Sequence, residues 1–133
     1  MRIMIDTNII ISAGLFGGGK LSKLTLEIAA RHNLVLSSDI IDELRAVMKA
    51  KFPDKTSVME RFLKCMNYEV SYTPTELDED IYPKIRDKKD YPVLASAIIA
   101  DVDVFITGDK DFSVLDIDRP EIMTISDFSF KYL

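Results

Sequence analysis

The chain has 133 residues, of which 47% are hydrophobic and 29% are charged, with five glycines and five prolines. This composition excludes a disordered or fibrous protein and predicts one globular domain over residues 1–133. The formal net charge of −5 argues against a protein that binds nucleic acid through bulk positive charge. A single cysteine, Cys65, excludes an internal disulfide framework. No signal-peptide pattern or apolar run of membrane-spanning length is found, so we expect a cytoplasmic protein.

Short apolar runs and longer helical stripes alternate along the first half of the chain. The run at residues 3–5 predicts a buried strand that ends at Asp6. Asn8 is the predicted N-cap of a helix that continues to Phe16. The other elements predicted here are a helix at residues 20–31, a strand at 34–36, a helix capped by residues 37–39 that continues to 51, a helix at 55–67 and a strand at 68–72.

The second half repeats this alternation. Residues 92–100 predict an almost wholly apolar helix, which suits burial against a sheet. The remaining predicted elements are a strand at residues 104–106, a helical turn at 112–115, a strand at 122–124 and a helix at 126–132. Alternating strands and helices predict an α/β fold, a three-layer αβα sandwich with a central, mainly parallel sheet of about five strands.

Four acidic residues fall where this architecture brings them together. Asp6 and Asp109 each follow a predicted strand, and Glu43 and Asp90 lie near the starts of predicted helices. In an open parallel sheet, strand ends and the following helix N-termini meet at one edge, where ligands bind. Each acid alone has a simpler explanation, such as a helix cap for Asp6 or a turn for Asp109. The convergence of four from separate elements favours a functional site.

Clustered carboxylates raise each other's pKa and destabilise a fold unless a positive charge lies between them. No histidine or cysteine accompanies these acids, so the ligand set is all oxygen, which suits Mg²⁺ or Mn²⁺ rather than Zn²⁺. A hard divalent ion held this way activates water and stabilises charge on a phosphodiester. The pattern therefore predicts metal-dependent phosphodiester hydrolysis.

Four short motifs surround these acids in an order and at intervals typical of one family. They are Ile-Asp-Thr-Asn at residues 5–8, Ile-Asp-Glu-Leu at 41–44, Asp-Tyr-Pro-Val-Leu-Ala-Ser-Ala at 90–97 and Thr-Gly-Asp-Lys-Asp-Phe at 107–112. Together they resemble the PIN-domain family of metal-dependent ribonucleases over essentially the whole chain. One departure is Tyr91, where the most similar branch often has a second acid.

The resemblance implies bound Mg²⁺ or Mn²⁺ and cleavage of RNA. It assigns the catalytic and metal-binding roles to the four acids, and supporting roles to three other residues. The ligands would be Asp6, Glu43, Asp90 and Asp109, oriented by Asn8 and Thr107, with Asp111 as an outer acid. Many compact members are toxin components of prokaryotic toxin–antitoxin pairs and dimerise. An RNA substrate, an antitoxin protein and a second copy of the chain are therefore the implied partners.

RNA contacts are expected on a basic rim around the acids. The preferred candidates are Arg86, Lys88 and Lys89, because they adjoin Asp90, and Lys20 follows the glycine-rich loop. Lys23, Arg45 and Lys49 are further candidates. For any one of these residues, an ordinary solvated side chain is the alternative.

Two alternative functions stay open on the sequence alone. A phosphatase of the haloacid dehalogenase type would use Asp6 as its nucleophile, with residues 108–111 as a metal loop. That mechanism wants an aspartate two residues after the nucleophile, where this chain has Asn8. A PIN-like module that binds RNA or a protein without cleavage is the second alternative. The four intact acids argue against it but do not prove turnover.

Overall fold

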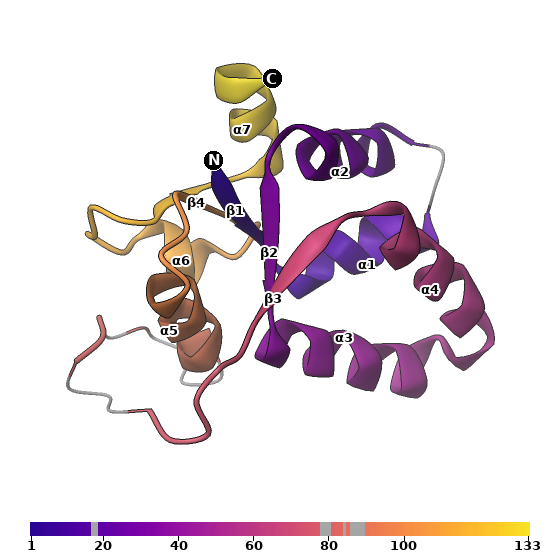
Figure 1. Cartoon of the computed structure of the whole chain (residues 1–133), viewed down its shortest axis with the longest axis horizontal. Coiled ribbons are helices and arrows are strands. Elements are labelled where there is room, and N and C mark those ends of the chain that lie inside the picture. The colour runs from indigo at the N-terminus through magenta and orange to yellow at the C-terminus, as the bar shows by residue number, and fades with distance from the viewer. Residues whose placement is uncertain (17–18, 78–80, 84, 86–89) are drawn as a thin grey trace.

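A single five-stranded parallel sheet forms the centre of the molecule (Figure 1). The computed structural model describes residues 1–16, 19–77, 81–83, 85 and 90–133. The strands are β1 (Arg2–Ile5), β2 (Asn33–Ser37), β3 (Tyr68–Ser71), β4 (Val104–Ile106) and β5 (Glu121–Met123). Their order is β3-β2-β1-β4-β5, and every neighbouring pair is parallel. The chain first builds outward from β1 through β2 to β3 and then restarts at β4, so the topological switch point lies between β1 and β4.

Helices cover both faces of this sheet. Figure 1 shows α1, α3 and α4 on one side of the strands and α5 and α6 on the other. The helices are α1 (Thr7–Leu15), α2 (Lys20–Arg31), α3 (Ser38–Lys51), α4 (Thr56–Cys65), α5 (Tyr91–Ile99), α6 (Lys110–Ser113) and α7 (Ile125–Tyr132), with a short 3-10 turn at Pro53–Lys55. The predicted three-layer α/β fold with a parallel sheet is confirmed.

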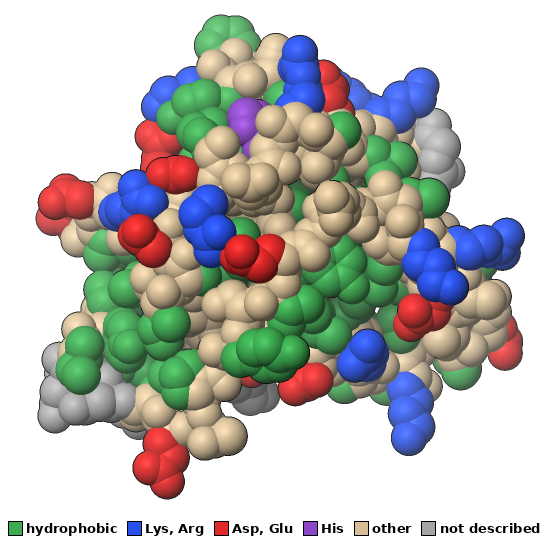
Figure 2. Space-filling model, viewed as in Figure 1, with side chains coloured by type: hydrophobic (Ala, Val, Ile, Leu, Met, Phe, Trp, Pro, Cys, Tyr) green, Lys and Arg blue, Asp and Glu red, His purple; other side chains and the backbone are tan. Residues whose placement is uncertain are grey.

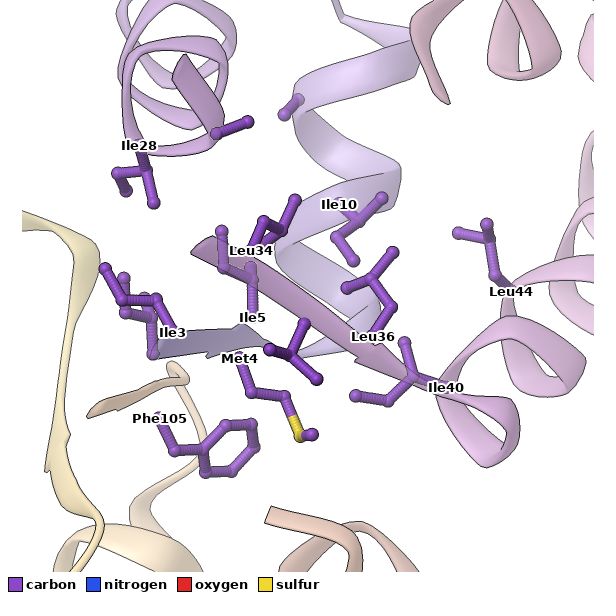
Figure 3. Close-up of a cluster of buried hydrophobic side chains, with 14 of the residues drawn as sticks. Ile3, Met4, Ile5, Ile10, Ile28, Leu34, Leu36, Ile40, Leu44 and Phe105 are labelled. Atoms are coloured by element: carbon purple, nitrogen blue, oxygen red, sulfur yellow. The ribbon is translucent and has the colours of Figure 1, made fainter. Parts of the chain in front are cut away.

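The strands read as continuous apolar runs because helices bury them from both sides. Ile3, Met4 and Ile5 are fully buried, as is Phe105 on the neighbouring strand. Figure 3 shows Met4 and Phe105 pointing together to one side of the sheet, whereas Ile5 points to the other. Met4 and Phe105 are paired in the register of β1 and β4, which places their side chains on the same face. The core therefore fixes the position of the strand ends that follow it.

Most predicted elements agree with the observed ones, but the start of α1 was predicted wrongly. Asp6, not Asn8, is the N-cap: its backbone is extended, and its side chain accepts a hydrogen bond from the Thr7 backbone N–H. The short helix predicted at residues 112–115 also begins earlier, at Lys110, because the Asp109 side chain caps it. Both corrections have one cause, since each strand is followed by an aspartate whose side chain caps the next helix.

Charged side chains are paired at the amino-terminal edge of the sheet. The Arg2 guanidinium lies 2.7 Å from the Glu69 carboxylate, and Arg119 contacts both Asp101 and Asp103 within 2.9 Å. Asp103 also accepts a hydrogen bond from the Arg2 backbone N–H. Positive and negative groups thus compensate one another at this end of the strands.

No single helix in the described part of the chain is long and apolar enough to cross a membrane. Only α1 and α2 taken together, across a bend of 117°, reach that length and composition.

Replacement of Phe105 by alanine tests the core beneath the strand ends. Phe105 is fully buried, and its ring packs edge-on against Phe112 with centroids 5.1 Å apart. We expect Phe105→Ala to lower the free energy of unfolding by about 3–5 kcal/mol, measured by urea denaturation. The matched control is Phe130→Ala, because Phe130 is 95% exposed and its loss is expected to change stability by less than about 0.5 kcal/mol. Equal losses for the two variants would contradict this account of the core.

Candidate metal centre

Asp6 is fixed at the junction of the two central strands. Its backbone N–H donates to the Ile106 carbonyl at 2.9 Å, which continues the pairing of β1 with β4. One carboxylate oxygen accepts the Thr7 backbone N–H, and the other accepts the Thr107 hydroxyl, each at 2.8 Å. Both oxygens are therefore oriented by hydrogen bonds from neighbouring elements.

Thr107 links Asp6 to the acids that follow β4. Its buried hydroxyl donates to Asp6 and accepts the backbone N–H of Asp109 at 3.1 Å. Asp109 in turn accepts the backbone N–H of Asp111 on its side chain at 2.9 Å. A hydroxyl can donate one proton and accept through its lone pairs, so Thr107 bonds to Asp6 and to Asp109 at the same time. This geometry supports the orienting role predicted for Thr107.

Among the described residues, three aspartates form a group whose oxygens are close enough to share one cation, and the predicted ligands Asp6 and Glu43 lie outside that group. Carboxylate oxygens of Asp90, Asp109 and Asp111 all lie within 4.8 Å of one another. Asp90 occupies the N-cap position of α5, but its side chain makes no capping hydrogen bond there. Asp111, predicted only as an outer acid, belongs to this group. The helix start at α5 and the turn after β4 thus converge as the topology predicts.

Glu43, on α3, is connected to the end of β1 by a hydrogen bond from Thr7, which the sequence analysis did not single out as a site residue. The hydroxyl of Thr7 donates to the Glu43 carboxylate at 3.2 Å, and Thr7 is fully buried. Thr7 is adjacent to Asp6 in the chain, so this bond connects the end of β1 to the second turn of α3. Its place inside the predicted Asp-Thr-Asn motif was the only signal that could have identified it.

The environment raises the pKa of two of these acids. Burial is the largest cause for Asp6, and the charge of Asp109 adds to it, while the hydrogen bonds from Thr107 and Thr7 oppose the rise. Glu43 is exposed as a residue, yet partial burial of its carboxyl group raises its pKa, and the charges of Asp6 and Asp39 act in the same direction. The charge of Asp109 therefore raises the pKa of Asp6, and the charge of Asp6 raises the pKa of Glu43. These three acids are electrostatically coupled.

The donor chemistry fits a hard divalent cation. Every candidate ligand atom is a carboxylate oxygen, which Mg²⁺ and Mn²⁺ prefer. Asp6, Glu43 and Asp109 make no ion pair with any residue in the part of the chain that the structure describes. Burial is the main cause of the raised pKa of Asp6, with the charge of Asp109 added to it, and a cation at this edge would favour the charged form.

The other predicted site residues have different placements. Asn8 is exposed in the first turn of α1, and no hydrogen bond of its side chain to a site acid is found among the described residues. Lys20 lines a pocket with Leu24 of α2 and Phe130 of α7, not the acidic group. Arg86, Lys88 and Lys89 lie outside the described residues.

A parallel sheet covered by helices, with acidic residues at its carboxyl edge, defines an α/β protein whose candidate site is built from carboxylates. Comparison with family models makes the assignment specific, because the model of the PIN domain matches residues 2–111. The chain therefore belongs to the PIN-domain family, whose members are generally nucleases.

A solved structure supports the same fold. The chain is similar to a chain in the crystal structure of VapBC2 from Rickettsia felis bound to a DNA fragment from their promoter. The TM-score is 0.61 at 20% sequence identity, over 92% of this chain and 97% of that chain. No curated protein matches the sequence. The family assignment favours the nuclease interpretation over the phosphatase one.

The raised pKa of Asp6 predicts a stability that depends on pH. A carboxyl group with a raised pKa in the folded state binds protons more readily there than in the unfolded chain. Stability then falls as pH rises through the window from the unfolded value, about 3.9, to the raised value, and the loss is complete above that window. We expect Asp6→Asn to raise the melting temperature of the metal-free protein at pH 7, with the gain shrinking as pH falls through the window and absent below about pH 4. A lower melting temperature for the variant at every pH would contradict this expectation.

Metal binding is testable by thermal unfolding without any substrate. We expect Mg²⁺ or Mn²⁺ to raise the melting temperature of the wild-type chain, by an amount equivalent to about 2.7 kcal/mol at a hundredfold excess over the dissociation constant. Asp6→Asn and Asp109→Asn should each reduce this shift. The control is Asp116→Asn, an exposed acid outside the cluster, which should keep the full shift. Sodium chloride of matched ionic strength serves as the blank.

Proposed function

We propose that the protein is a Mg²⁺- or Mn²⁺-dependent endoribonuclease that hydrolyses RNA phosphodiester bonds. The proposal is supported by one observation: Asp90, Asp109 and Asp111 lie together after β4 and at the start of α5, and hydrogen bonds connect Asp6 to Asp109 through Thr107 and Glu43 to Thr7, the residue after Asp6. Membership of a family of nucleases supports the reaction class.

Asp6, Glu43, Asp90 and Asp109 would hold the cation in this proposal, with Asp111 beside them. When bound, the cation supplies a Lewis acid that activates water and stabilises charge on the phosphoryl group. The chain's own contribution is orientation, because the Thr107 hydroxyl holds Asp6 and the Thr7 hydroxyl holds Glu43. Thr7 contacts both acids, Glu43 through its hydroxyl and Asp6 through its backbone N–H, and Thr107 couples Asp6 to the backbone of Asp109.

We further propose that the protein is the toxin component of a toxin–antitoxin pair, with an antitoxin protein as its partner. The likeness of its fold to a chain of the VapBC2 structure supports this role. A homodimer and a cytoplasmic location complete the proposal. The homodimer rests on the motif resemblance, and the location rests on the sequence patterns described above.

The direct test is cleavage of RNA by the purified protein with Mg²⁺ or Mn²⁺. A cation on a phosphoryl group contributes several kcal/mol, so Asp6→Asn or Glu43→Gln should lower kcat at least about a hundredfold. Thr107→Val, which removes only an orienting hydroxyl, should cost about 10- to 100-fold. A chelator should abolish cleavage by the wild-type protein.

The matched control for Glu43→Gln is Asp42→Asn, because Asp42 is the adjacent residue on α3 and is exposed. This variant should retain activity close to that of the wild type. Cleavage that survives both the chelator and Asp6→Asn would refute the proposed function. Metal binding without cleavage of any RNA would favour the non-cleaving binding module.

A further inference from the structure

Tyr72 is an aromatic side chain left in solvent at the carboxyl end of β3. It follows Ser71, the last residue of that strand, and is 80% exposed. The other tyrosines in the described ranges are all buried or half-buried. Figure 2 shows hydrophobic side chains reaching the surface over β3 and the start of α3, and Val70 on the same strand is 38% exposed.

The backbone on both sides of Tyr72 is fixed. Ser71 pairs with Ser37 in the register of β3 with β2. On the other side, the Thr73 N–H donates to the Ser38 hydroxyl at 2.8 Å, and the Thr73 hydroxyl lies 2.7 Å from the Ser96 hydroxyl. A tyrosine has two side-chain torsions, so on a fixed backbone it presents a flat surface at little entropic cost. This combination distinguishes Tyr72 from an exposed residue on a loosely held loop.

The same anchor connects Tyr72 to the elements that carry the acids. Thr73 accepts the Asp39 N–H on its hydroxyl at 3.4 Å, at the start of α3. The charge of Asp39 acts on Glu43, which is bonded to Thr7 next to Asp6. Ser96, on the other side of Thr73, lies on α5, the helix that begins after Asp90. Tyr72 therefore lies at the carboxyl edge of the sheet, beside the start of α3, which carries Glu43, and beside α5, which Asp90 precedes.

Because the protein is negatively charged, an aromatic side chain can bind a nucleic acid here without the repulsion that the phosphate backbone meets. The chain carries a formal charge of −5, and the site gathers carboxylates, so the phosphate backbone of a substrate meets repulsion except where a cation lies. Stacking of a base on an aromatic ring involves no net charge and works with any base. In a paired duplex both faces of each internal base are covered, so only an unpaired base can use such a ring.

We propose that Tyr72 is a stacking platform for an unpaired base of the substrate strand where that strand passes β3. This inference rests on the proposed nuclease function and adds a substrate-binding residue to it. Tyr72 contacts the substrate away from the acids, so it affects the binding of the strand and not the hydrolytic step.

The test measures binding separately from cleavage. Fluorescently labelled single-stranded RNA is titrated with Asp6→Asn protein in the presence of Mg²⁺, and Tyr72→Ala is then added to that background. Loss of one stacked base should raise the dissociation constant about 5- to 100-fold. Tyr72→Phe, which keeps the ring, should bind within about twofold of the parent. The same RNA annealed to its complement should bind more weakly and respond little to either substitution.

Phe130→Ala is the matched control, because Phe130 is also a highly exposed aromatic residue and lies on α7, which carries none of the site acids. That helix packs through Phe128 against His32, which precedes β2 at the opposite edge of the sheet. This variant should leave the dissociation constant unchanged. Equal affinities for Tyr72→Ala and its parent would overturn the inference. So would a change of oligomeric state on size-exclusion chromatography, because Tyr72 would then belong to a protein interface.

Kinetics separate this inference from the proposed function. In the wild-type background, Tyr72→Ala should raise KM for single-stranded RNA with kcat nearly unchanged, because the ring binds the strand and not the reacting atoms. If no RNA is cleaved but Tyr72→Ala still weakens binding, the nuclease proposal fails while the platform stands. If RNA is cleaved with an unchanged KM, the platform fails alone.

Discussion

The parallel pairing of β1 with β4 is the constraint on which the site depends. It places Ile5 opposite Ile106, so the residues that follow, Asp6 and Thr107, meet although 101 positions separate them in the chain. A single hydroxyl then orients acids on both strand ends. The apolar contacts beneath, Met4 with Phe105 among them, hold the two strands in the register that makes this bond possible.

The hydrogen bonds that orient Asp6 oppose the effects that raise its pKa. Burial and the neighbouring charge of Asp109 raise the pKa of Asp6, whereas hydrogen bonds from Thr7 and Thr107 lower it. The fold therefore stores an unfavourable interaction at the switch point, and a cation would relieve it. Stability and function are in conflict at this edge, as is common where charged groups are collected for chemistry.

Much of this arrangement follows from sequence pattern alone. Apolar runs of three or four residues identify the buried strands, and an acid directly after such a run lies at the ligand-binding edge whatever the exact register. The hydrogen bond from Thr7 to Glu43 was not predictable in this way, because it joins residues on α1 and α3 whose separation depends on helix packing. Likewise, spacing could not distinguish Asp6 from Asn8 as the helix cap. The backbone angles at the end of the strand decide that choice, and both residue types cap well.

Charge is distributed unevenly between the two edges of the sheet, because ion pairs form at the amino-terminal edge. Arg2 with Glu69, and Arg119 with Asp101 and Asp103, largely cancel one another there. At the opposite edge, Asp6, Glu43 and Asp109 have no such counterpart among the described residues. These described acids attract a cation that diffuses towards them, and their field raises its local concentration above the bulk value before any ligand bond forms. This enrichment weakens as ionic strength rises, so occupancy of the carboxyl edge depends on the salt in solution as well as on the metal.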